Sequence, residues 1–258
     1  MKKIFWLCLS VVSFMNLIAC TSTLVDTRDN QEYKIVTIGR QTWMAQNLNY
    51  RYEPEAKGDT SSYCYNNIAD SCSKYGRLYL RNAAMDMSGR IPGNKPLDCD
   101  GLASCKVSGN VRGVCPEGWH LPSKAEWDTL ITVAGGPKMA ANVLKAPSDW
   151  LYNGKGTCGY GSNLSLFTAL PAGIGFVHHW DDPPYGSVKS LAASTALGET
   201  TFFWSSTELE DRRAYFMSLS SCDDDSTFSS SDMLGRMQQM AFMFELAFSV
   251  RCVKDWSI

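Results

Sequence analysis

Pro122-Ser123-Lys124-Ala125-Glu126-Trp127 predicts the start of an amphipathic helix. Ser123 and Glu126 have the S-x-x-E spacing of a capping box, in which the two side chains satisfy free backbone N–H groups at a helix start. The apolar residues that follow have the helical spacing i, i+3, i+4, i+7, namely Trp127, Leu130, Ile131 and Ala134. Gly135-Gly136 is expected to end this helix, and Pro137 suits the first turn of a second short helix.

Segments typical of β-strands lie on both sides of these helices. Residues 32–38 are rich in β-branched side chains and are followed by Gly39-Arg40 and residues 41–45, a pattern that predicts a β-hairpin. Residues 78–87 are partly periodic and predict another helix. Further short strands are expected at residues 202–205, 214–219 and 248–253. The sequence therefore predicts an α+β domain with short strands, two or three helices and long loops.

The first twenty residues indicate export. Met1-Lys2-Lys3 is positively charged, and residues 4–18 form an apolar run that is too short for a bilayer span, which needs about 20 residues. Leu17-Ile18-Ala19-Cys20 resembles a bacterial lipobox, which implies that Cys20 is lipidated on sulfur and becomes the mature N-terminus. The alternative is a simple secretory signal in which Cys20 is incidental.

These features divide the chain into three parts. Residues 1–19 are interpreted as the signal peptide, residues 20–30 as the lipidated cysteine with a short polar tether, and residues 31–258 as one domain. Thr21 follows Cys20, and the usual Gram-negative sorting pattern without Asp at that position favours the outer membrane. The membrane is therefore the first expected partner, through the N-terminal lipid, and the sequence leaves open which face the protein occupies.

The cysteine content agrees with an exported protein. Beyond Cys8 and Cys20, eight cysteines remain, and an even number in an oxidising compartment favours four disulfides. Eight cysteines allow about a hundred pairings, so the sequence does not fix the connectivity. Zinc is the alternative, but the chain has no C-x-x-C pair and we expect no metal. We favour Cys64–Cys72 and Cys99–Cys105, which close small loops. Cys115–Cys252 would join the middle of the chain to its last predicted strand, and Cys158–Cys222 is the pair that remains.

Charge and aromatic content narrow the choice of partner. The formal net charge is -2, so no overall basic field favours nucleic acid or anionic lipid. Aromatic residues make up 12% of the chain, with eight Trp. Exported proteins rich in Trp and Tyr often stack these rings on sugars, although most such residues fill cores.

Four motifs resemble one known family. They fall in the order in which the Fibrobacter succinogenes major paralogous domain family has them: GRQTWMAQNLN (residues 39–49), VCPEGWHLPSKAE (residues 114–126), FWSSTE (residues 203–208) and FSVRCV (residues 248–253). The resemblance covers roughly residues 25–255 and implies an exported protein or lipoprotein. It implies no biochemical activity. The Met-rich residues 233–243 depart from the polar loop expected in this family, and Ala247 stands where a glycine is frequent.

A wider resemblance concerns the fold. The Leu-Pro-Ser-x-x-Glu-Trp segment is similar to one in formylglycine-generating enzymes, which implies a C-type-lectin-like fold. In lectin domains a cysteine near the second helix commonly pairs with one in the last strand, and Cys115 and Cys252 fit that arrangement. The enzymes bind copper through a cysteine pair near the C-terminus, for which Cys222 and Cys252 are the candidates here. Fold does not give function, and structural bridges are the favoured interpretation of these cysteines.

Other candidate chemistry is weak. Met237, Met240 and Met243 have a spacing that could suit Cu(I), but methionine more often fills irregular gaps. The acidic clusters 181–182 and 223–225 could suit calcium, but neither follows an EF-hand pattern and the calcium-lectin tripeptides are absent. His178 and His179 would face opposite sides of a strand, and His120 is interpreted as structural. We expect no cofactor and no enzymatic activity.

Aromatic residues in loops are the remaining route to function. They lie in Gly-, Pro- or Asp-rich stretches, where binding residues are common. Trp180 with Asp181, Asp182 and Tyr185 would provide a stacking face and carboxylates that accept hydrogen bonds from sugar hydroxyls. Trp150, Tyr152 and Tyr160 are further candidates.

The sequence thus favours a non-catalytic binding or adhesion module of the cell envelope, with polysaccharide as ligand. The first alternative is a structural protein that contacts other envelope proteins and has no small-ligand site. The second is an oxidase related to formylglycine-generating enzymes.

Overall fold

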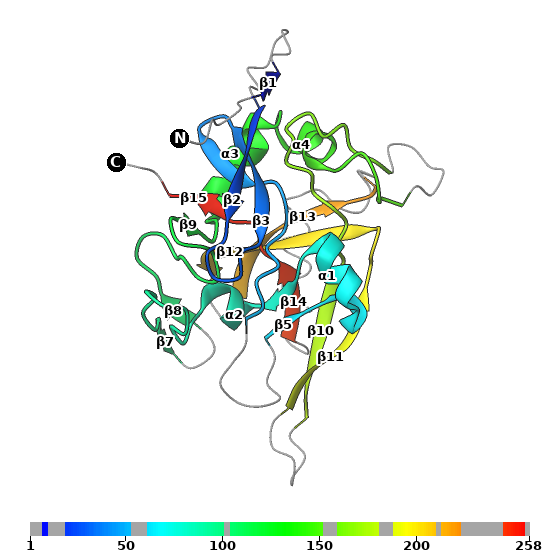
Figure 1. Ribbon diagram of the computed structural model, residues 1–258. Coiled ribbons are helices and arrows are strands. Elements are labelled where there is room, and N and C mark those ends of the chain that lie inside the picture. The colour runs from blue at the N-terminus through cyan, green and yellow to red at the C-terminus, as the bar shows by residue number, and fades with distance from the viewer. Residues whose placement is uncertain are drawn as a thin grey trace.

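The protein is built from two curled β-sheets with short helices and long connections (Figure 1). The computed structural model describes residues 7–9, 19–52, 61–100, 104–151, 159–180, 188–209, 213–222 and 245–255. The Met-rich segment 233–243 and the acidic clusters 181–182 and 223–225 lie outside the described residues. The predicted mixture of short strands, helices and disulfides is confirmed.

The first sheet is antiparallel throughout and has the order β1-β2-β3-β4-β15-β9. Its strands are β1 (Leu7–Leu9), β2 (Ala19–Val25), β3 (Glu32–Ile38), β4 (Gln41–Met44), β15 (Val253–Lys254) and β9 (Trp119–His120). The predicted β3–β4 hairpin is confirmed, with Ile38 paired with Gln41 across a two-residue turn. Gly39 has φ +60, which favours glycine, and it approaches Val133 so closely that an added Cβ would lie 3.1 Å from a Val133 methyl group.

The second sheet is assembled around β14. Its main order is β11-β10-β14-β12-β13, with β6 paired with β14 and β5 paired with β6. The contact between β12 and β14 is parallel and the other pairs are antiparallel. The strands are β5 (Ser62–Tyr63), β6 (Leu78–Leu80), β10 (Ile174–Trp180), β11 (Val188–Thr195), β12 (Thr200–Leu209), β13 (Arg213–Ser220) and β14 (Glu245–Ser249). A separate hairpin joins β7 (Asp98–Asp100) and β8 (Ser104–Lys106).

The described residues contain four α-helices and one 3-10 helix, rather than two or three helices. They are η1 (Tyr65–Asn67), α1 (Ala69–Tyr75), α2 (Arg81–Met85), α3 (Lys124–Val133) and α4 (Pro137–Leu144). The helix expected at residues 78–87 is shorter, because Leu78–Leu80 pairs with β14 before α2 begins. No helix in the described part of the chain is long and apolar enough to span a membrane.

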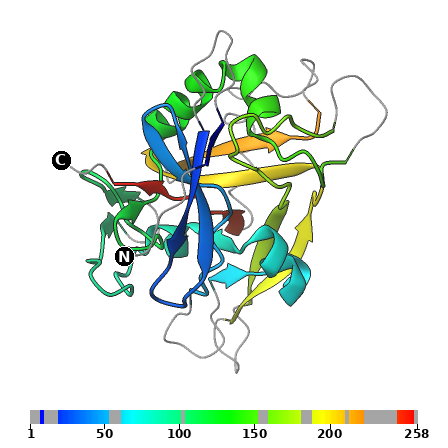
Figure 2. The same ribbon diagram turned by 45° about the horizontal axis from the view of Figure 1, so that its top comes forward.

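The predicted capping box of α3 is present. Ser123 Oγ accepts a hydrogen bond from the Glu126 N–H, and the Ser123 N–H donates to Glu126 Oε2 at 2.8 Å. The apolar side of α3 then packs above the β12–β13 hairpin (Figure 2). Trp127 lies 4.7 Å from Trp43 and 5.6 Å from Phe203, measured between ring centres. This aromatic cluster forms the centre of one of the hydrophobic cores.

Residues 20–30 differ from the expected tether. Residues 21–25 pair with β3, and the following turn carries Asp26, which is almost completely buried. Backbone pairing and a buried ion pair with Arg28 hold this segment against the domain. The polar side chains that suggested a tether therefore belong to an ordered strand and turn.

Three predicted disulfides are present: Cys64–Cys72, Cys99–Cys105 and Cys115–Cys252. Cys222 is also disulfide-bonded. Cys158 lies outside the described residues, so its pairing with Cys222 remains a prediction.

Candidate functional site

Two of the family motifs meet inside the molecule, where Arg251 of the last motif contacts the first motif and the segment at Phe167-Thr168. Its side chain is only 1% exposed. The guanidinium donates to Asn47 Oδ1 at 2.7 Å and to the carbonyl oxygens of Met44, Phe167 and Thr168. Its central carbon lies 4.4 Å from the centre of the Phe167 ring.

The environment of Arg251 stabilises a charge without a carboxylate. All the hydrogen-bond acceptors that contact it among the described residues are neutral oxygens. Burial lowers the pKa of Arg251 to about 9, which still leaves the side chain charged at neutral pH. Backbone dipoles and the aromatic ring replace solvent around the cation. The side chain is enclosed, so this residue organises the fold and is not accessible to a ligand.

His120 forms a second buried polar group. Its Nε2 lies 2.8 Å from Glu126 Oε1, and its Nδ1 lies 2.6 Å from Asp255 Oδ1. Burial alone would lower the pKa of His120, but the hydrogen bonds and charges of the two carboxylates outweigh it and raise the pKa above its usual value. Burial would raise the pKa of Glu126, but His120 and Ser123 lower it overall.

This arrangement is structural rather than catalytic in its geometry. The imidazole separates the two carboxylates, so the three side chains do not converge on one point, and His120 is 2% exposed. No group of three metal-ligating side chains occurs among the described residues. The interpretation of His120 as a structural residue is therefore confirmed.

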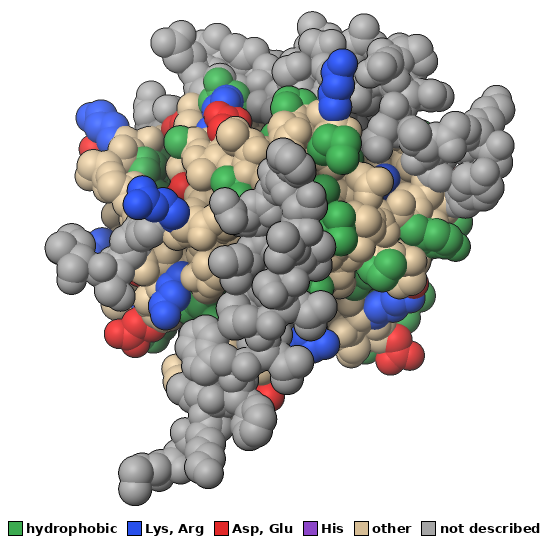
Figure 3. Space-filling view, turned by 90° about the horizontal axis from the view of Figure 1, so that it is seen from above, with side chains coloured by type: hydrophobic (Ala, Val, Ile, Leu, Met, Phe, Trp, Pro, Cys, Tyr) green, Lys and Arg blue, Asp and Glu red, His purple; other side chains and the backbone are tan. Residues whose placement is uncertain are grey.

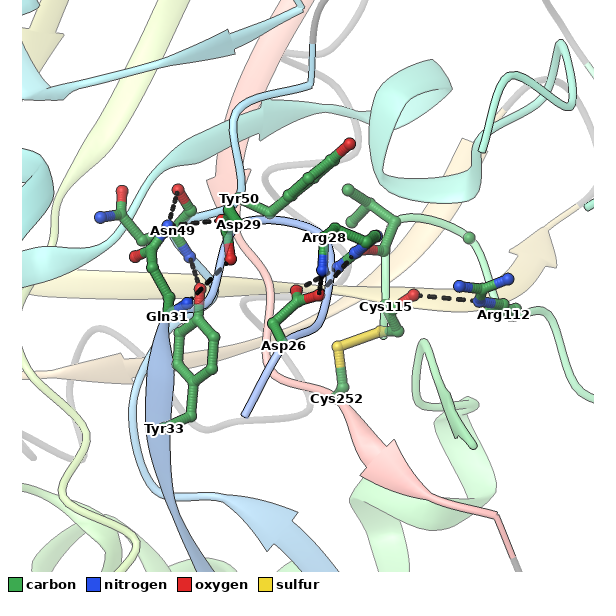
Figure 4. A network of polar contacts seen from close by, with 12 residues as sticks. Asp26, Arg28, Asp29, Gln31, Tyr33, Asn49, Tyr50, Arg112, Cys115 and Cys252 are labelled. Atoms are coloured by element: carbon green, nitrogen blue, oxygen red, sulfur yellow. Dashed lines mark hydrogen bonds and ion pairs between the residues drawn. A yellow bond between two sulfur atoms is a disulfide. The ribbon is translucent and has the colours of Figure 1, made fainter. Parts of the chain in front are cut away.

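A third polar network fixes the N-terminal hairpin to the long-range disulfide (Figure 4). Arg28 Nε donates to Asp26 Oδ1 at 2.8 Å, and an Arg28 Nη donates to the Val114 carbonyl at 2.9 Å. The Arg28 guanidinium also lies 3.9 Å from the centre of the Tyr50 ring. Because Val114 precedes Cys115, these contacts connect the β2–β3 turn to the Cys115–Cys252 bridge. Sequence reasoning missed Arg28, which no local pattern marks, and did not single out Arg251, although it lies in the FSVRCV motif.

The aromatic residues predicted to bind sugar lie in different environments. Trp150 is 1% exposed, and its Nε1 donates to the Ala169 carbonyl at 3.0 Å, so it is a core residue and the prediction that it binds ligand is corrected. The local Gly-rich sequence concealed this, because burial of Trp150 depends on distant strands. Tyr160 is 61% exposed and lies beside the end of α4, where the next residue, Gly161, donates to the Ala146 carbonyl. Tyr152 lies outside the described residues.

Trp180 is the last residue of β10, which forms a projecting two-stranded ribbon with β11 (Figure 1). Residues 175–177 of β10 pair with both β11 and β14, whereas residues 178–180 pair with β11 alone among the described strands. Figure 1 shows this ribbon extending from the body at the end opposite α3 and α4. The structure therefore does not bring Trp180 together with Trp150 and Tyr160. Asp181, Asp182 and Tyr185 belong to the seven-residue connection between β10 and β11, which lies outside the described residues.

The candidate oxidase pair is not assembled. Cys252 is bonded to Cys115, with a Cα–Cα distance of 5.9 Å, and both residues are completely buried. Cys222 has a different partner. A copper-binding pair of Cys222 and Cys252 is therefore contradicted by the disulfide pattern.

The model of the Fibrobacter succinogenes major domain matches residues 36–254. The chain belongs to this family. No curated protein and no solved structure matches the chain.

Proposed function

We propose that this protein is an exported, lipid-anchored binding module of the bacterial cell envelope, attached to the outer membrane, that binds polysaccharide without catalysing a reaction. We further propose that its two curled sheets and helices form a C-type-lectin-like fold. The interpretation of Cys20 as a lipidation site supports the anchor, and the arrangement of described residues supports a binding role.

The observation that carries the proposal is the division between core and ribbon. Motif residues such as Trp43, His120, Phe203 and Arg251 are buried. The β10–β11 ribbon instead projects beyond the sheet, and its connection has the sequence Trp180-Asp181-Asp182-Pro183-Pro184-Tyr185. Aromatic rings and carboxylates in the sequence that connects the two strands of this ribbon match the stacking faces and hydroxyl groups of sugars.

The test is binding of the mature, oxidised protein to a panel of soluble and insoluble polysaccharides, with and without calcium. Saturable binding to one class of polysaccharide, reduced at least ten-fold by Trp180→Ala, is the expected result. Leu164→Ala is the control, because it removes an equally exposed apolar side chain that is not a candidate binding residue. Absence of binding across the panel would overturn the proposal and favour a role in contacts with envelope proteins. Equal binding by Trp180→Ala and the unaltered protein would exclude the ribbon as the site.

A further inference from the structure

The position of Cys20 relative to the sheet determines where a lipid would emerge. Thr21 pairs with Val36, so the start of β2 lies level with the end of β3, next to the turn at Gly39-Arg40. Cleavage before Cys20 would remove β1 and leave Cys20 adjacent to the first paired residue. β1 itself lies beyond this same end of the molecule (Figure 1).

Almost no flexible chain separates Cys20 from the domain. One extended residue spans at most about 3.6 Å, and only Cys20 precedes the paired residues of β2 in the cleaved chain. Downstream, the buried Asp26–Arg28 ion pair and the Arg28 contact with the Val114 carbonyl hold the turn after β2 in place. A lipid on Cys20 would therefore hold this end of the domain against the bilayer.

The chemistry of this end suits a membrane surface. Gly39 packs against Val133, which places the end of α3 and the start of α4 beside the β3–β4 turn. Arg40 and Lys138 are exposed, and Met139 is 53% exposed. Residues 36–42 and 129–144 contain no Asp or Glu. Basic side chains attract anionic headgroups, and an exposed apolar side chain between them can enter the interface.

We propose that the end of the molecule formed by Arg40, Lys138 and Met139, which we call the anchor face, lies on the lipid bilayer. Figure 3 looks onto this end and shows hydrophobic and basic side chains side by side, with acidic side chains mostly toward the rim. The β10–β11 ribbon extends from the opposite end (Figure 1), so the end of β10 at Trp180 lies away from the anchor face. This inference rests on the proposed lipid anchor and adds the orientation of the bound domain.

The test uses the full lipidated protein in vesicles of phosphatidylcholine with phosphatidylglycerol. A genetically encoded fluorescent amino acid replaces Met139 in one sample and Val107, which is exposed and follows β8, in the other. Lipids with a nitroxide on the headgroup quench fluorophores that lie near the bilayer surface. We expect quenching at position 139 to be at least three-fold stronger than at position 107. Equal or reversed quenching would overturn the orientation.

Charge variants test the contribution of the anchor face. Arg40→Gln with Lys138→Gln is expected to reduce quenching at position 139 about two-fold, whereas Lys106→Gln on β8 is expected to leave it unchanged. Unchanged quenching in the double variant would overturn the electrostatic part of the proposal. The mass of the N-terminal peptide is measured first: an unmodified Cys20 would overturn the lipid anchor itself, whereas a lipidated chain with equal quenching overturns only the orientation.

Discussion

Arg251 Nε donates a 2.7 Å hydrogen bond to Asn47 Oδ1 across 204 residues of sequence. Asn47 in turn donates to the Tyr75 carbonyl at 2.8 Å. The bond therefore connects the last motif of the chain to the first, and Asn47 ties both to the end of α1. Because Arg251 also binds the carbonyls of Phe167 and Thr168, it holds the long connection before β10 against the core.

Replacement of Arg251 by Lys should destabilise the protein. The ammonium group has no planar array of donors and cannot reach Asn47 and three backbone carbonyls together, so buried acceptors lose their partners. We expect Arg251→Lys to lower the free energy of unfolding by about 2–4 kcal/mol. Urea unfolding followed by fluorescence measures this change. Arg40→Lys, in an exposed turn, is the matched control and should change the free energy by less than about 0.5 kcal/mol; a similarly small effect at Arg251 would contradict the role assigned to it.

The contribution of His120 to stability should decrease as the pH rises above the ordinary pKa of histidine, about 6.5. Its pKa is raised in the folded state, so its contribution is fully present below the unfolded pKa of about 6.5 and is lost as the pH rises through the folded pKa. Glu126 acts in the opposite direction: its folded pKa is lowered, so its contribution is present above the ordinary value of 4.5 and is lost as the pH falls through the folded pKa. Between these limits both contributions are present.

The comparison of the unaltered protein with His120→Gln isolates this effect. The difference between their free energies of unfolding should be larger at pH 5.5 than at pH 8.5, as measured by urea unfolding at both values. The double variant His178→Gln, His179→Gln controls for the other histidines and should leave the pH dependence unchanged. A difference between His120→Gln and the unaltered protein that stays constant with pH would show that the imidazole charge does not contribute.

Local rules were sufficient to predict part of this structure from sequence. The capping box of α3, Pro137 at the start of α4 and the β3–β4 turn each depend on residues close together in the chain, and all three were found. Long-range pairing was harder to predict. The β10–β11 ribbon was missed because its register shifts between Phe176 and Val177, so no regular alternation of side chains runs along it.

Polar residues that act across the fold left no local signal either. Asp86 accepts hydrogen bonds from Tyr52 Oη at 2.7 Å and from the Ile91 N–H at 3.0 Å, and it is almost completely buried. In sequence it is one acidic residue after α2, indistinguishable from a solvated side chain. Trp150 is the reverse case: its sequence is loop-like, but distant segments of the chain bury it.

Removal of the Cys115–Cys252 bridge should cost more stability than removal of Cys99–Cys105. The first bridge joins residues separated by 137 positions and the second joins residues separated by six. In the chain-entropy model, a cross-link that closes a longer loop restricts the unfolded chain more, with about 5 kcal/mol expected for the long loop and about 2 kcal/mol for the short one. The long-range bridge also carries the segment to which Arg28 is bound, so its loss should loosen the turn after β2.

Two double variants compare the bridges under identical oxidising conditions: Cys115→Ala with Cys252→Ala, and Cys99→Ala with Cys105→Ala. Urea unfolding should show a difference of about 2–3 kcal/mol between them, and hydrogen exchange at residues 26–31 should increase in the first variant alone. Equal losses of stability, with unchanged exchange at this turn, would show that the long-range bridge does not fix the N-terminal hairpin to the domain.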